Sequence, residues 1–93
     1  MNRFAYRAYY QYDGPTKANP YRTEKTADGV VDAIQRFPME LEYLLPEGAR
    51  IEIQQHEDPK SSRIVVVTPA DRVTTNATVE RCLMGLDLYG ERL

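Results

Sequence analysis

The sequence contains no tryptophan, one cysteine, one histidine and only three lysines in 93 residues. The lone Cys82 cannot form an internal disulfide, and no charged and then apolar leader precedes the first predicted strand, so we expect a cytoplasmic protein. His56 stands beside Glu57 and Asp58, but neighbouring residues on a strand point to opposite faces, so these three side chains do not converge. We therefore expect neither a metal site nor a catalytic nucleophile.

Long apolar runs and a strong net charge are also missing. No run approaches the roughly 18 apolar residues of a membrane span, and 12 basic against 14 acidic residues give a net charge of -2. This balance excludes the overall basicity of a non-specific nucleic-acid binder, although a local basic patch remains open. We find no catalytic motif, metal-ligand spacing or phosphate-binding loop. A single domain of this size, without cofactor chemistry, favours a non-enzymatic protein that works through its surface.

Aromatic residues are concentrated at the start of the chain, where residues 3–12 hold four of the seven tyrosines. Their alternation predicts a β-strand that ends at the turn formed by residues 13–15. One face of this strand is expected to join the core, with Phe4, Tyr6, Ala8, Tyr10 and Tyr12. The other carries Arg3, Ala5, Arg7, Tyr9 and Gln11.

The middle of the chain predicts a helix and then a hairpin. Thr26 is a plausible helix N-cap, and apolar residues at helical spacing predict a helix over about 27–36. Pro38 is expected to stop or kink this helix and to start a short apolar one. Alternation over 49–56, a turn, and the run 63–68 then predict two antiparallel strands, the second of them apolar on both faces.

A final helix, capped by Thr74 or Thr75, is predicted from the apolar stripe that Val79, Cys82, Leu83, Leu86 and Tyr89 form. The order strand, helix, strand, strand, helix predicts a single α+β domain, a two-layer sandwich with an antiparallel sheet. It resembles a ferredoxin-like fold that lacks its last strand. Such folds host many functions, so the resemblance implies no site. It does imply that the first strand is a sheet edge, which can pair with a partner or with a second copy in a homodimer.

The predicted sheet face away from the helices is rich in arginine, which outnumbers lysine nine to three in the chain. Arginine suits bidentate recognition of carboxylate or phosphate. The candidate partner-binding residues on this face are Arg7, Tyr9, Gln11, Arg50, Gln54 and Arg63.

Three interpretations of this face stay open. The first is an inhibitor or adaptor that binds another protein through the first strand and the basic face. In size and composition the chain resembles small acidic inhibitors and adaptors, many of which phages and other mobile elements encode. The second is single-stranded nucleic-acid binding, with Tyr9 stacking a base and arginines holding the backbone. The third is that the face is only solvated. We favour a protein partner over nucleic acid because the strand at 63–68 has no aromatic residue, unlike the central strands of the RNA-recognition motif.

Overall fold

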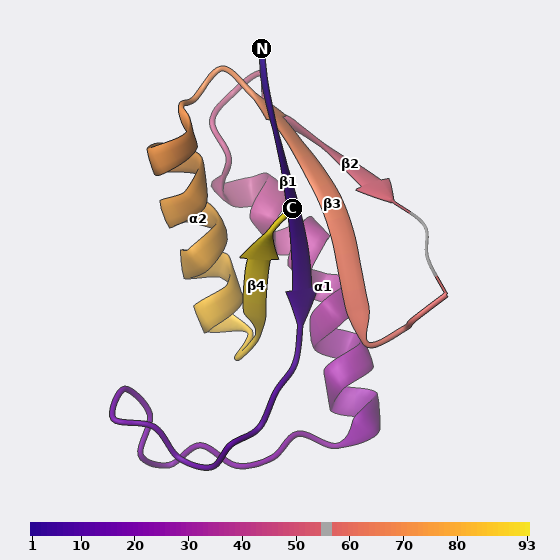
Figure 1. Cartoon of the computed structure of the whole chain (residues 1–93), viewed down its shortest axis with the longest axis vertical. Helices are drawn as coiled ribbons and strands as arrows, with labels where there is room; N and C mark the ends of the chain where they lie inside the picture. Colours follow the sequence, from indigo (N-terminus) through magenta and orange to yellow (C-terminus); the bar gives the residue numbers. More distant parts are fainter. Residues whose placement is uncertain (55–56) are drawn as a thin grey trace.

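The computed structural model describes residues 1–54 and 57–93, which form four strands and two helices. In chain order these are β1 (Asn2–Tyr9), α1 (Ala27–Leu44), β2 (Arg50–Gln54), β3 (Ser61–Thr68), α2 (Arg72–Gly85) and β4 (Tyr89–Arg92) (Figure 1). The strands form one antiparallel sheet in the order β2-β3-β1-β4. The α+β two-layer architecture of ferredoxin-like type is therefore confirmed.

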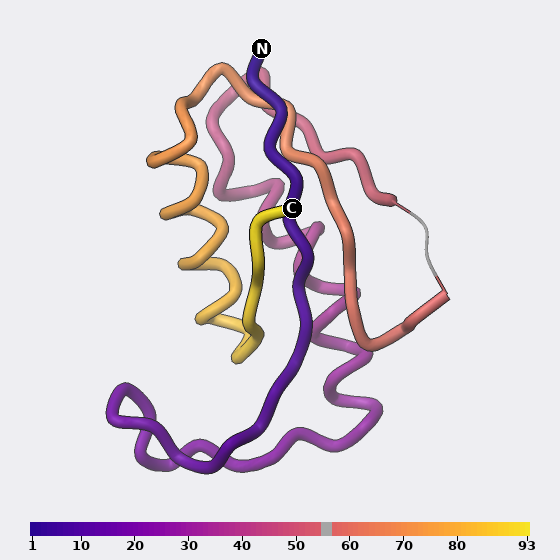
Figure 2. Tube along the Cα trace, in the orientation of Figure 1, coloured from indigo at the N-terminus to yellow at the C-terminus, as the bar shows by residue number. Residues whose placement is uncertain are grey.

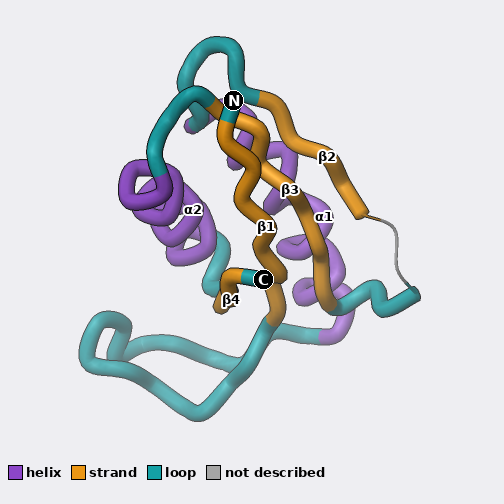
Figure 3. The backbone as a smooth tube through the Cα atoms, turned by 45° about the horizontal axis from the view of Figure 1, so that its top comes forward, coloured by secondary structure: helices purple, strands orange, loops and turns teal. Residues whose placement is uncertain are grey.

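Both helices lie on one side of the sheet and leave the other side uncovered (Figure 3). The side chains that face the helices alternate along β1, where Tyr6 and Ala8 are buried and Phe4 is partly buried. β3 is buried on both faces, as its apolar sequence predicts. Complete burial of a side chain such as Phe37 or Ile64 stabilises the fold by about 1.5–3 kcal/mol.

The prediction of a missing last strand is wrong, because the last helix ends at Gly85 rather than reaching Tyr89. The backbone N–H groups of Leu86 and Leu88 both donate to the Leu83 carbonyl, and Asp87 takes a positive φ of 55°. This turn reverses the chain and places Leu88 in the core. Apolar spacing cannot distinguish that arrangement from one more helical turn at Leu86, which is buried in either case.

The strand that follows this turn, β4, pairs with β1 from Tyr6↔Arg92 to Tyr9↔Tyr89. The first strand is thus a central strand over its second half, from Tyr6 to Tyr9, and the expectation that it is a sheet edge along its whole length is wrong. β2 and β4 are the edges instead. The expected homodimer depended on a free edge along the first strand, and β4 occupies that edge from Tyr6 to Tyr9.

The prediction that the first helix stops at Pro38 and a second one starts there is also wrong, because α1 is one helix of 18 residues that continues through Pro38 to Leu44. An interior proline costs a helix about 3 kcal/mol through the lost hydrogen bond and the clash with the preceding turn. Phe37 and Leu41 lie on either side of Pro38 and are both fully buried. Their burial, at about 1.5–3 kcal/mol each, outweighs the cost of the proline.

Two caps fix where the helices begin. Thr26 caps α1, as predicted, and its hydroxyl accepts from the Gly29 N–H at 3.0 Å. α2 begins earlier than predicted, because Asp71 is the cap and accepts from the Thr74 N–H at 2.8 Å. That backbone hydrogen bond lowers the pKa of Asp71. The cap predicted at Thr74 or Thr75 is therefore wrong.

β1 ends at Tyr9, before the predicted boundary, and a long loop leads from it to α1 (Figure 2). The Tyr10 hydroxyl accepts from the Lys25 N–H at 2.9 Å and so ties one end of this loop to the other. The loop passes below β4 and the C-terminal end of α2, where it meets the last strand.

Candidate functional site

The uncovered side of the sheet, which we call the open face, is where the sequence places its candidate residues. The strand register puts four arginines and two glutamates on it, a net charge of +2 in a chain whose net charge is -2. These are Arg3, Arg7, Arg50 and Arg63 with Glu52 and Glu91. The expected basic face is present, but its charges are distributed unevenly between two halves.

In one half of the open face, a bridge of ion pairs covers the sheet. Arg3 of β1 donates to both oxygens of Glu52 on β2, at 2.6 and 3.3 Å, and Arg50 donates to Glu52 at 3.1 Å. The hydrogen bond from Arg3 is the main cause of the lowered pKa of Glu52. The bridge crosses β3 over Val65 and Val67, which explains why both valines are buried on a face that no helix covers.

In the other half, four polar side chains form one row across all four strands. The register aligns them in the order Gln54, Arg63, Arg7 and Glu91. Arg7 donates to Glu91 at 3.1 Å, whereas Arg63 has no carboxylate partner among the described residues. Arg7 and Arg63 are direct cross-strand neighbours, and like charges in such positions repel. This polar row therefore holds one cation more than it can neutralise.

Tyr9 lies beside the polar row, at the end of β1. The Arg7 guanidinium stands 4.8 Å from the centroid of its ring, and the ring of Tyr89 stacks on it with centroids 5.9 Å apart. Tyr89 is in turn contacted by Arg22 at 5.7 Å. Both tyrosine rings are thus already engaged by groups of the protein itself.

The structure brings together four of the six predicted residues, namely Arg7, Tyr9, Gln54 and Arg63. Arg50 shares the open face but belongs to the ion-pair bridge in its other half. Gln11 does not lie on the sheet, because β1 ends at Tyr9 and the Gln11 side chain donates to Asp13 in the loop. Its prediction as a face residue is wrong. His56 lies outside the described residues.

Sequence reasoning missed a cluster around one buried arginine, Arg22, where the long loop meets β4. The side chain of Arg22 is only 3% exposed, and its Nε donates to Asp87 at 2.8 Å. Burial by itself lowers the pKa of Arg22, but the hydrogen bond and charge of Asp87 raise it overall. Its guanidinium also contacts the rings of Tyr10, Tyr12 and Tyr89, at 5.1 to 5.7 Å.

We call this group the Arg22 cluster. A second nitrogen of Arg22 donates to the backbone carbonyl of Gln11, while Nη1 is buried without a hydrogen-bond partner among the described residues. The concentration of tyrosine on both sides of a lone loop arginine was the available signal, since cation–π pairs bring these residue types together. The cluster fastens the loop to the turn before β4.

Cys82 behaves as a core residue. It is buried on α2, and burial raises the pKa of its thiol to about 11. A thiol with such a pKa stays protonated at neutral pH and is a poor nucleophile. No group of three or more metal-ligating side chains is found in residues 1–54 and 57–93.

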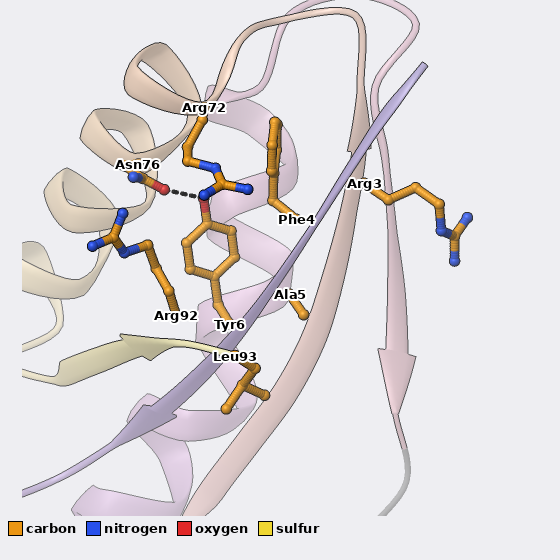
Figure 4. A pocket seen from close by; sticks show the side chains of 8 residues that line it. All are labelled: Arg3, Phe4, Ala5, Tyr6, Arg72, Asn76, Arg92 and Leu93. Atoms are coloured by element: carbon orange, nitrogen blue, oxygen red, sulfur yellow. Dashed lines mark hydrogen bonds between the residues drawn. The ribbon is translucent and has the colours of Figure 1, made fainter.

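A small notch opens on the helix side of the sheet, where β4 ends short of the first residues of β1. It is an open cavity of about 380 Å³ between β1 and α2. Figure 4 shows Tyr6 at its centre, with Arg72 and Arg92 on either side. The Tyr6 hydroxyl donates to Oδ1 of Asn76. Burial raises the pKa of Tyr6, and the nearby charges of Arg72 and Arg92 act in the opposite direction.

No protein-family model, curated protein or solved structure matches this chain. Among the described residues, neither helix has the length and hydropathy needed to cross a bilayer. Function therefore has to be argued from the open face and from the notch.

Proposed function

We propose that this is a non-enzymatic interaction protein, of inhibitor or adaptor type, that binds an acidic segment of another protein through the polar row and Tyr9. The observation that carries this proposal is the cross-strand pair of Arg7 and Arg63, in a row whose one carboxylate, that of Glu91, pairs with Arg7. A cytoplasmic location belongs to the same proposal and rests on the single cysteine.

The polar row supports a carboxylate-bearing partner on physical grounds. Placing two guanidinium groups side by side costs free energy in the unbound protein, and an incoming carboxylate relieves that repulsion. Each guanidinium can form a charge-assisted, bidentate contact with it. Gln54 stands next to Arg63 in the row and offers both a donor and an acceptor to a partner backbone. The row is therefore complementary to an acidic surface.

Single-stranded nucleic acid is the second candidate, favoured by the stacked pair of Tyr9 and Tyr89 beside Arg7. Bases stack on exposed aromatic faces, and each such stack contributes about 1–3 kcal/mol. The contacts of these rings with each other, with Arg7 and with Arg22 reduce the ring surface available to a base. This is why we place a protein partner first.

Charge reversal at Arg63 tests the proposal with little risk to the fold, because this side chain is exposed and forms no ion pair with the residues that the structure describes. Tagged wild-type protein and Arg63→Glu would be used to capture partners from a lysate of the source cells, with mass spectrometry as the readout. We expect proteins retained by the wild type to be lost from Arg63→Glu and from Tyr9→Ala. Arg81→Glu is the matched control, since Arg81 is an exposed arginine on α2 and far from the open face in the fold.

Two outcomes would contradict the assignment. If Arg63→Glu retains the same proteins as the wild type, the polar row is not the binding surface. If instead the wild type binds labelled oligo(dT) or oligo(U), with a logarithmic salt slope of about -0.7 per phosphate contacted, nucleic acid replaces protein as the partner class. Fluorescence anisotropy at two salt concentrations measures this directly.

A further inference from the structure

The notch between β1 and α2 exists because β4 is shorter than the strand it pairs with. β4 covers β1 from Tyr6 to Tyr9, and one further hydrogen bond, from the Leu93 N–H to the Ala5 carbonyl, closes the pairing. Beyond that point no described strand pairs with the outer edge of β1, and an open cavity is lined by this part of β1 and the first turns of α2. The site is separate from the open face, and the inference below does not depend on the proposed function.

Two arginines from different elements reach the notch. Arg92 is the cross-strand neighbour of Tyr6, so its side chain lies on the helix side of the sheet. Arg72 begins α2 and stands over the ring of Phe4, with the guanidinium carbon 5.6 Å from the ring centroid. Neither has a carboxylate partner among the described residues. Figure 4 shows both guanidinium groups on the same side as the Tyr6 hydroxyl, whereas Arg3 points away to the open face.

The other polar side chains that line the notch on its helix side are those of Tyr6 and Asn76. Asn76 lies one turn after Arg72 on α2, and its Oδ1 already accepts from Tyr6. Its Nδ2 group therefore retains hydrogens to donate. The adjoining part of the groove includes Glu80, one further turn along α2, whose charge acts on Tyr6. A cavity with two guanidinium groups and a free amide N–H₂ is complementary to an anion.

We propose that the notch is a binding site for a phosphate monoester. One guanidinium is enough to satisfy the two oxygens of a carboxylate, whereas two guanidinium groups and an amide match the three free oxygens and the double charge of a phosphate monoester. The cavity of about 380 Å³ exceeds the phosphate group and leaves room for the organic part of the ligand next to the ring of Phe4. Sugar phosphates and phosphorylated side chains share this chemistry.

The test is a titration followed by ¹⁵N NMR, with glycerol 3-phosphate and N-acetyl-phosphoserine amide as two separate probes. We expect both to shift the Asn76 side-chain N–H₂ signals, and the tighter of the two identifies the source of the phosphate. Arg72→Gln and Arg92→Gln should each weaken binding about tenfold or more, because each removes a charge-assisted contact. Arg81→Gln, on the same helix but outside the notch, should bind like the wild type.

Three results would overturn the proposal. Neither probe shifts the Asn76 signals; Arg81→Gln weakens binding as much as the two notch variants; or malonate, a dicarboxylate of similar charge, binds as tightly as the phosphates. Arg72 and Arg92 are exposed, and unchanged backbone spectra of the variants would show that they are folded.

Discussion

Two arginine sites on either side of β1 show opposite uses of the same side chain. Arg22 is enclosed by the protein's own carboxylate, carbonyl and aromatic rings, and only 3% of its side chain is exposed. Arg63 stands exposed in the polar row, beside another cation and with no carboxylate partner within residues 1–54 and 57–93. The charge of Arg22 is neutralised within the fold by Asp87, although its Nη1 has no hydrogen-bond partner among the described residues, whereas the charge of Arg63 has no neutralising carboxylate there. A count of arginines therefore says little about binding until each guanidinium has been assigned its partners.

Removing Arg22 should have the largest effect on stability. Arg22→Met preserves the length of the side chain but leaves the Asp87 carboxylate and the Gln11 carbonyl without their donor. Breaking a largely buried ion pair costs far more than breaking an exposed one, and we expect the melting temperature to fall by roughly 10 °C. Thermal unfolding followed by circular dichroism measures this.

Two variants control that experiment. Arg81→Met removes an exposed arginine and should change the melting temperature by less than about 3 °C. Asp87→Asn keeps a side chain that tolerates the positive φ of this position but removes the charge. Its melting temperature should therefore lie between those of Arg22→Met and Arg81→Met. If Arg22→Met and Arg81→Met unfold at the same temperature, the contrast between the two sites does not hold.

Reversing the charge of Arg63 should raise the stability of the fold, whereas removing Arg22 should lower it. Arg63→Glu replaces a repulsive cross-strand neighbour of Arg7 with an attractive one, and we expect a gain of about 0.2–1 kcal/mol in the free energy of unfolding. Urea denaturation at low salt measures it. The same variant is expected to lose its partner, so a gain in stability together with a loss of binding would mark Arg63 as a residue kept for recognition. A loss of stability would show that Arg63 has a structural role.

The smallest effect concerns the ion-pair bridge, which should respond to acid. The folded-state pKa of Glu52 lies below its ordinary value of 4.5, so the charged form stabilises the folded protein above that pH. This contribution is lost as the pH falls through the lowered pKa. The melting temperature of Glu52→Gln should therefore lie slightly below that of the wild type at pH 7, and the difference should shrink as the pH falls below 4.5 and through the lowered pKa. A difference that stays constant with pH would exclude the charge of Glu52 as its cause.

Much of the fold was predictable because alternation and helical spacing report burial. The two faces of β1, the double burial of β3 and the cap at Thr26 all follow from residues whose environment is local. What the sequence could not show was decided by distant contacts. Pro38 stays helical because Phe37 and Leu41 are buried around it, and the turn at Asp87 is held in part by Arg22, 65 residues earlier.

The candidate site was predictable to the same extent. Alternation places Arg7 and Tyr9 on the open face, and the hairpin pattern adds Gln54 and Arg63. The register then decides which of these meet, and register depends on turns that a single sequence does not specify. The notch could not be predicted from the sequence. It brings Arg72 of α2 and Arg92 of β4 close to Tyr6, and β4 begins in a segment that periodicity assigned to the last helix.

The central position of β1 also has a consequence for the order in which the protein assembles. Both neighbours of β1 in the sheet, β3 and β4, come from the last third of the chain. At a synthesis rate of about 5–20 residues per second, the ribosome needs roughly 3–10 s to synthesise the 51 residues between Tyr9 and Ser61. During that time a strand rich in tyrosine has no sheet to join. Nascent β1 is therefore a segment that a chaperone would be expected to shield.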